Sequence, residues 1–186
     1  MTVTGIGVVG FAFLLVTTLA VTPEAEAAMA LTLTSSAFKQ NAPMPSRLTC
    51  EGDDRSPPLA WTGVPEGTKS LALIVDDPDA PDPKAPKRVW VHWIVYNLSP
   101  DLPGLAENAD RAGLPAGASR GLNDARTTAY GGPCPPIGRH RYFHKLYALD
   151  TELDLDRPTK SSLETAMKGH VLAQTELVGT YQKGDR

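Results

Sequence analysis

Two stretches decide how this chain folds: Asp76-Asp77-Pro78-Asp79-Ala80-Pro81 and Gly138-Arg139-His140-Arg141-Tyr142. The first follows the continuous apolar run Leu71–Val75, which is typical of a central strand buried on both faces. Its prolines end that strand because proline lacks the N–H that a sheet ladder needs. The second stretch opens a predicted strand over 140–149, with His140 and Tyr142 on one face. Polar groups beside apolar strands need partners, so we expect the two stretches to converge on a small polar pocket.

A third strand is predicted over Val89–Asn97. A period of two places His92 on one face with Trp90, Ile94 and Tyr96. An isolated histidine inside a strand usually bonds a backbone carbonyl. Alternatively, a carboxylate fixes its tautomer and the other ring nitrogen meets a ligand. The nearby aspartates suit either turn capping or such an orienting role, so both interpretations stay open.

The rest of the chain predicts a mainly β domain with few helices. The 17 prolines and 16 glycines are spread out, which favours turns and short strands. An edge strand is expected at Leu31–Thr34, a long loop over Ser99–Gly132 and a last strand over Glu176–Tyr181. Ser161 and Glu164 fit a capping box. An apolar stripe at helical spacing then runs over Leu163, Ala166, Met167, His170 and Val171.

Composition restricts the classes of function. At 186 residues with a net charge of −3, the chain suits one domain and makes no electrostatic case for nucleic acid. It contains no motif of a serine hydrolase, a zinc protease or a phosphate-binding loop. His92, His140 and His144 lack a recognisable metal spacing, and His144 is expected to be a core residue. We therefore expect no enzyme, cofactor or metal; a hydrolase with an Asp–His base is the alternative.

The N-terminus is typical of a secretory signal peptide. Ile6–Val21 is apolar and uncharged, and small residues follow in Ala25-Glu26-Ala27-Ala28-Met29-Ala30. We expect a leader over residues 1–27, with cleavage after Ala27 or Ala30, and a single domain over 31–182. An uncleaved membrane anchor is the alternative, although the run is shorter than the ~20 residues that span a bilayer. Export permits a disulfide between Cys50 and Cys134, and two buried free thiols are equally compatible with the sequence.

The same motifs resemble those of the phosphatidylethanolamine-binding protein family, and most of all its bacterial, YbhB/YbcL or Raf-kinase-inhibitor-like branch. The resemblance extends over Leu31–Tyr181, nearly all of the expected mature chain. Besides the two opening stretches, it rests on these segments: Leu48–Asp54, Ser56–Leu59, His92-Trp93, Tyr130–Pro136, Leu146–Asp150, Met167–Ala173 and Leu177–Tyr181. It implies the family fold, with a large central antiparallel sheet, a smaller sheet and a few peripheral helices.

The resemblance also implies a pocket for phosphate, acetate or a phosphoethanolamine head group. The family's pocket positions correspond here to Asp77, Asp79, His92, Gly132, Pro133, His140 and Tyr142. We expect Asp77 to orient His92 or His140, and the imidazole and phenol groups to donate to a ligand oxygen. The glycines before Pro133 are expected to offer free backbone N–H groups, which suit an anion. The basic loop Asp82–Arg88 is expected to shape the rim.

The expected function is therefore a binding protein for a small anion or phospholipid head group. Family members of this kind inhibit kinases or proteases, so a regulatory role toward an unidentified protein is a further expectation. The bacterial branch is often dimeric, which makes a homodimer another. An extracellular interaction module that uses Ser99–Gly132 is the remaining alternative.

The leader makes a direct prediction. If it is removed, the exported protein begins at Ala28 or Leu31, and an intact-mass measurement on secreted or periplasmic material will show that start. A membrane-bound product that keeps residues 1–27 would instead support the anchor.

Overall fold

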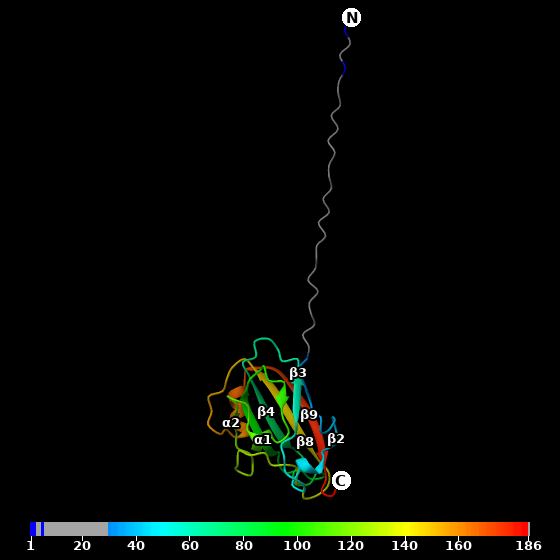
Figure 1. Ribbon diagram of the computed structural model, residues 1–186, viewed down its shortest axis with the longest axis vertical. Helices are drawn as coiled ribbons and strands as arrows, with labels where there is room; N and C mark the ends of the chain where they lie inside the picture. The colour runs from blue at the N-terminus through cyan, green and yellow to red at the C-terminus, as the bar shows by residue number, and fades with distance from the viewer. Residues whose placement is uncertain (3–4, 6–29, 186) are drawn as a thin grey trace.

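The computed structural model describes residues 1–2, 5 and 30–185 (Figure 1). The predicted leader therefore lies almost wholly outside the described residues, as does the cleavage site after Ala27. In the part of the chain that is described, no helix has the length and apolar character needed to cross a membrane.

Two β-sheets form the domain. The large sheet has the order β2 (Ala42–Pro43), β9 (Val171–Tyr181), β8 (His140–Leu149), β4 (Ser70–Asp77), β5 (Trp90–Leu98) and β7 (Ser119–Arg120). Its pairs are antiparallel except β2 with β9. The small sheet joins β1 (Thr32–Thr34), β3 (Leu59–Thr62) and β6 (Gly104–Leu105). The prediction of a mainly β fold with a large and a smaller sheet is confirmed.

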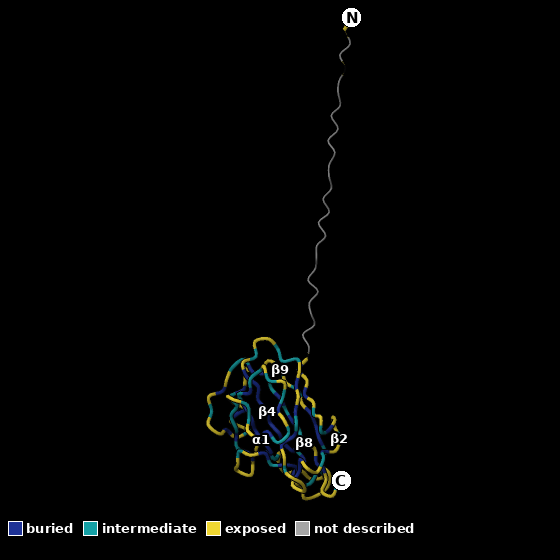
Figure 2. The backbone as a smooth tube through the Cα atoms, viewed as in Figure 1, coloured by how far each residue is buried: buried dark blue, intermediate teal, exposed yellow. Residues whose placement is uncertain are grey.

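The apolar core has two parts, one on each face of the large sheet. Leu33 and Trp61 of the small sheet pack with Leu73 and Val95 of the large sheet on one face. On the other face, Ile74 and Ile94 pack with residues of helix α2 (Lys160–Met167). Every residue of β4 is buried, which explains its continuous apolar run, and the tube around the β4 label in Figure 2 is dark blue.

The predicted helix is real, but its limits differ from the prediction. Its N-cap is Thr159, whose side chain accepts a hydrogen bond from the Ser162 N–H, so Ser161 is not the cap. The helix ends at Met167, and the stripe does not continue to His170 and Val171. Gly169 adopts a φ of +87°, which favours glycine and reverses the chain. Val171 instead begins β9, five residues earlier than the predicted last strand.

The segment 99–132 is more ordered than the predicted loop. It contains β6, the short helix α1 (Ala109–Ala112) and β7. The guanidinium of Arg120 bonds both the side chain and the backbone carbonyl of the buried Asp110. An ion pair and short ladders thus hold this segment against the domain, which periodicity in the sequence could not reveal.

A disulfide joins Cys50 to Cys134, two residues 84 positions apart, with a Cα–Cα distance of 5.4 Å. Cys50 follows the short 3-10 helix η1 (Ser46–Leu48), and Cys134 precedes β8. The backbone N–H of Cys50 also donates to the carbonyl of Pro133 at 3.1 Å. The link therefore fastens two loops that share no strand pairing.

We predict that the double variant Cys50→Ser, Cys134→Ser loses about 2–5 kcal/mol of unfolding free energy, because the crosslink closes a long loop in the unfolded chain. Urea denaturation followed by circular dichroism measures this loss, and reduced wild-type protein serves as the matched comparison. Equal denaturation midpoints for oxidised, reduced and double-variant protein would contradict the stabilising role.

Candidate functional site

A cavity of about 350 Å³ lies where β4, β5 and β8 meet the loop 131–136. Of the seven predicted pocket residues, five line it, namely Asp77, His92, Gly132, His140 and Tyr142. Asp79 and Pro133 do not line it, although both lie beside lining residues in the chain. Cys134 of the disulfide forms part of its wall.

A β-bulge positions His92 in this cavity. Val75 and Asp76 are consecutive on β4, whereas their partners on β5, Trp93 and Val91, are two residues apart. His92 is therefore the extra residue, and the side-chain alternation shifts across it. The prediction that His92 shares a face with Ile94 and Tyr96 is wrong for this reason.

The change of side-chain alternation at the bulge orients the His92 side chain toward β8. Val91 packs with Ile94 and Tyr96 on the α2 side of the sheet. The ring of His92 instead packs edge-on against Tyr142, with ring centroids 5.2 Å apart. Because Tyr142 belongs to the core between the two sheets, the bulge moves His92 onto the cavity side.

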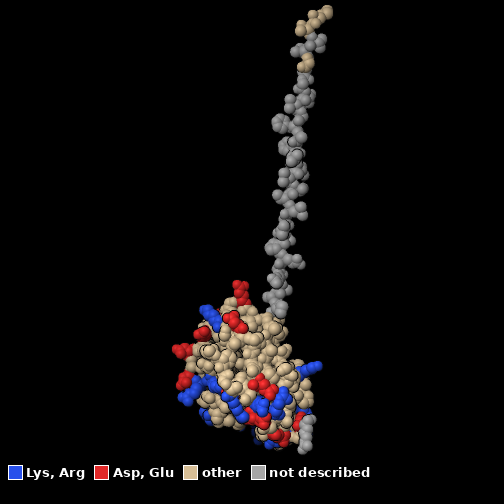
Figure 3. Space-filling model, viewed as in Figure 1, with Lys and Arg blue, Asp and Glu red and all other residues tan. Residues whose placement is uncertain are grey.

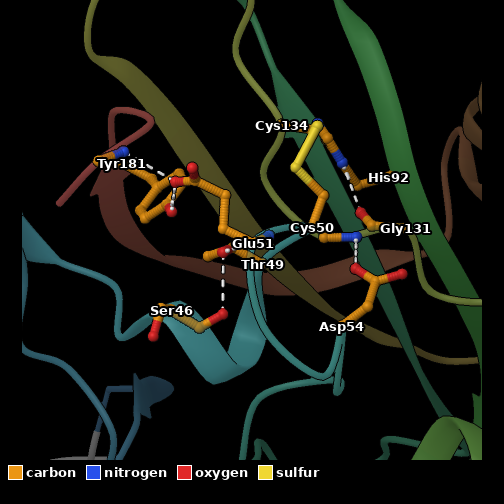
Figure 4. Close-up of a disulfide and its surroundings, with 11 residues drawn as sticks. Ser46, Thr49, Cys50, Glu51, Asp54, His92, Gly131, Cys134 and Tyr181 are labelled. Carbon is orange, nitrogen blue, oxygen red and sulfur yellow. Dashed lines mark hydrogen bonds between the residues drawn. A yellow bond between two sulfur atoms is a disulfide. The ribbon is translucent and has the colours of Figure 1, made fainter. Parts of the chain in front are cut away.

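A backbone carbonyl, and not a carboxylate, holds the His92 ring. Nδ1 lies 2.6 Å from the carbonyl oxygen of Gly131 (Figure 4). Burial lowers the pKa of His92 below its ordinary value, so the ring is neutral near neutral pH. Within the described residues, Nε2 has no hydrogen-bond partner.

Asp77 orients His140, which decides between the two histidines that the sequence left open. Its Oδ2 lies 2.7 Å from Nδ1 of His140, and both side chains are buried. Nε2 of His140 lies 3.0 Å from the carbonyl oxygen of Ile137. Both ring nitrogens therefore face protein acceptors. The expectation that His140 and Tyr142 donate together to a ligand does not match this geometry.

Asp79 does not line the cavity and instead holds the start of β8 through hydrogen bonds. It accepts hydrogen bonds from the backbone N–H of Arg141 and from its guanidinium at 2.7–2.9 Å. The hydrogen bond from Arg141 holds the pKa of Asp79 below its usual value, against the opposing effect of burial. The partly exposed guanidinium of Arg141 is therefore paired with this carboxylate.

Tyr142 lines the cavity and carries a phenolic hydroxyl. The residue is 1% exposed, and its hydroxyl oxygen has no hydrogen-bond partner within the described residues. Burial raises the pKa of this phenol well above its ordinary value, so the O–H stays protonated. It is therefore available as a hydrogen-bond donor near neutral pH.

The glycine loop does not provide free amides, contrary to expectation. The N–H of Gly131 donates to the carbonyl of His92 at 3.1 Å, and the N–H of Gly132 donates to Oδ1 of Asp54 at 2.7 Å. The loop therefore serves to position His92 and to close the wall. Its two glycines are not an anion nest.

Arg88 lines the cavity, and the sequence placed it only as one member of the expected rim loop Asp82–Arg88. Its guanidinium lies 4.2 Å from the centroid of the Trp90 ring, a cation–π contact at the cavity mouth. No ion pair of Arg88 occurs within the described residues. The predicted basic rim loop was the available signal, but spacing alone could not select Arg88.

His144 is a core residue, as expected. Its Nδ1 lies 3.2 Å from the carbonyl oxygens of Tyr142 and Leu177, and its ring packs against Phe38. Burial lowers its pKa to about 4.

Among the described residues, no three His, Cys, Asp or Glu side chains are placed to hold a metal ion. Charges of both signs are interspersed on the face shown in Figure 3.

Comparison with known proteins identifies relatives across the domain. A family model described as phosphatidylethanolamine-binding protein matches residues 34–182. A UPF0098 protein of Methanothermobacter thermautotrophicus is 51% identical over 83% of this chain and 100% of its own length. The crystal structure of a homolog of this family from Chlamydia trachomatis has a TM-score of 0.75 and 46% identity, covering 83% and 98% of the two chains. YbcL of E. coli has a TM-score of 0.75 and 34% identity, covering 83% and 99%.

The glycine loop provides a matched pair of variants. A Cβ on Gly132 would lie 2.5 Å from the Leu48 carbonyl oxygen and would also collide with the Asp54 carboxylate. A Cβ on Gly131 would meet no atom closer than 3.9 Å. We predict that Gly132→Ala lowers the unfolding free energy by about 1–3 kcal/mol. Gly131→Ala should change it by less than about 0.5 kcal/mol.

Urea denaturation of both variants checks this pair. Equal stabilities would mean that the 131–136 loop is not held as the structure places it.

Proposed function

Because this chain belongs to the phosphatidylethanolamine-binding protein family, we propose that it is a ligand-binding protein whose cavity holds a phosphate-like anion or a phosphoethanolamine-type head group. One observation carries the proposal. Seven described residues have buried side-chain atoms without a hydrogen-bond partner, and only His92 and Tyr142 among them line the cavity. A buried polar group left unpaired costs about 1–3 kcal/mol, which a bound ligand that pairs with both groups would recover.

Charge and shape support the same ligand class. The guanidinium of Arg88 at the mouth favours an anion, whereas the deeper groups of His92 and Tyr142 are neutral. A volume of about 350 Å³ accommodates a small molecule or a head group. Its walls include Trp90, Val91 and Pro135, so an apolar part of the ligand would also find contacts.

We infer a binding role and not an enzymatic one. The relatives are named only as UPF0098 or phosphatidylethanolamine-binding family proteins, and these names indicate no activity. An Asp–His base is the alternative that the geometry disfavours. The base would be Nε2 of His140, and that atom lies 3.0 Å from the Ile137 carbonyl and not free in the cavity.

Three further parts of the proposal concern the setting of the protein. We propose that the chain is exported, that it acts as an inhibitor or regulator of another protein, and that it forms a homodimer. The first rests on the apolar N-terminal run and the disulfide, which is stable in an oxidising compartment. The other two rest on the family alone.

Tyr142→Phe tests the binding site because it removes one oxygen and keeps the buried ring. We expect this variant to bind inorganic phosphate and phosphoethanolamine about 10- to 100-fold more weakly, the loss of one hydrogen bond to a charged group. Tyr147→Phe on the same strand is the matched control, since Tyr147 does not line the cavity. Calorimetric titration measures both.

Wild-type affinity in Tyr142→Phe, or an equal loss in Tyr147→Phe, would place the anion elsewhere on the protein.

A further inference from the structure

The hydrogen bond between His92 and Gly131 determines which hydrogen-bonding group the ligand must present to His92. A carbonyl oxygen can only accept, so Nδ1 of His92 carries the proton in the 2.6 Å contact with Gly131. In a neutral imidazole, the other nitrogen then has a lone pair and no proton. Nε2 of His92, a residue that lines the cavity, is therefore a hydrogen-bond acceptor.

The groups around His92 leave the ring neutral. Burial lowers its pKa, and this effect exceeds the opposing influence of the Gly131 carbonyl and of the carboxylates Asp77, Asp76 and Asp54. Asp77 belongs to β4 and is itself bonded to His140 of β8. Tyr142 of β8, which packs edge-on against His92, is uncharged. Arg88 at the mouth adds a positive charge, which also disfavours an imidazolium.

Among the described residues, the two unpaired polar atoms on cavity-lining side chains are thus opposite in hydrogen-bonding character. The Tyr142 hydroxyl donates to a ligand oxygen, and Nε2 of His92 accepts from a ligand hydrogen. An oxyanion without a proton would satisfy Tyr142 but would face the lone pair of His92 with another lone pair. It could bind fully only if His92 took up a proton in a buried environment that opposes it.

We propose that the cavity selects a tetrahedral oxyanion that keeps a proton on one oxygen, with Nε2 of His92 accepting the hydrogen bond from that proton. This inference rests on the proposed function and names the ligand class within it. Inorganic phosphate has such a P–OH group near neutral pH. Sulfate, a tetrahedral dianion like hydrogen phosphate, has none, and neither does the phosphodiester of a phospholipid head group.

The test is a set of calorimetric titrations at pH 7 with three probes: inorganic phosphate, sulfate and dimethyl phosphate. The last is the phosphodiester group of a phospholipid without amine or hydroxyl donors, so it separates a lipid phosphodiester from free phosphate. We expect sulfate and the diester to bind about 10- to 100-fold more weakly than phosphate, the effect of one unmade hydrogen bond beside a charge. Sulfate or diester binding as tight as that of phosphate would overturn the inference and leave the proposed function standing.

Proton uptake gives a second readout on the unaltered protein. Titrations in two buffers of different ionisation heat count the protons taken up on binding. We expect about one proton for sulfate at high concentration, because only sulfate requires an imidazolium at His92. For phosphate we expect only the fraction of a proton that accompanies selection of one of its two ionisation states near pH 7. Equal proton uptake for the two anions would contradict the role of His92.

His92→Gln assigns the selectivity to one residue. The glutamine amide can present either an oxygen or an N–H group, so the preference for phosphate over sulfate should narrow to less than about threefold. His170→Gln, the same change at an exposed histidine, should leave the preference intact. An unchanged preference in His92→Gln would overturn the assignment. No binding of any probe by the wild type would overturn the proposed function itself.

Discussion

Burial of two adjacent carboxylates at the end of β4 is the constraint on which the site depends. The central strand is covered on both faces, so Asp76 and Asp77 enter the interior on opposite sides of the sheet. Asp76 accepts from Lys145 of β8 at 2.9 Å and from Lys160 of α2 at 2.5 Å, which ties the helix to the sheet. Asp77 faces the other way and pairs with His140. Each carboxylate would be costly to bury alone, so its partners are fixed in place.

The cavity lies next to the pair formed by Asp77 and His140. Most polar groups around it have hydrogen-bond partners within the protein. Asp77, His140, Gly131 and Gly132 all have protein partners. The bulge on β5 adds His92, whose ring is anchored through Nδ1 only. Among the described residues, Nε2 of His92 and the Tyr142 hydroxyl thus remain without hydrogen-bond partners, the first an acceptor and the second a donor. The disulfide (Figure 4) fastens the part of the cavity wall that contains Cys134.

The sequence predicted the main strands correctly, but it did not predict several details of the local geometry of the site. Strand 140–149 and the buried β4 followed from periodicity and from the prolines after Asp77. The face of His92 did not, because a bulge depends on the register between two strands and leaves no mark in one strand's pattern. The backbone N–H groups of the glycine loop were wrongly expected to be free. Their acceptors, His92 and Asp54, lie 39 and 78 positions away in the chain, so the sequence pattern could not reveal them. Which histidine Asp77 orients likewise depends on the tertiary structure, so the sequence left both histidines open.

The central claim is that His92 enters the cavity as a neutral ring with a free acceptor nitrogen and that an oxyanion binds there. Nitrogen-15 NMR of the histidine side chains, with and without inorganic phosphate, tests it most directly. The account predicts that free His92 is protonated at Nδ1 alone, and that phosphate shifts the Nε2 signal while the ring stays neutral. A ring protonated only at Nε2, or an Nε2 signal that saturating phosphate leaves unmoved, would contradict the account.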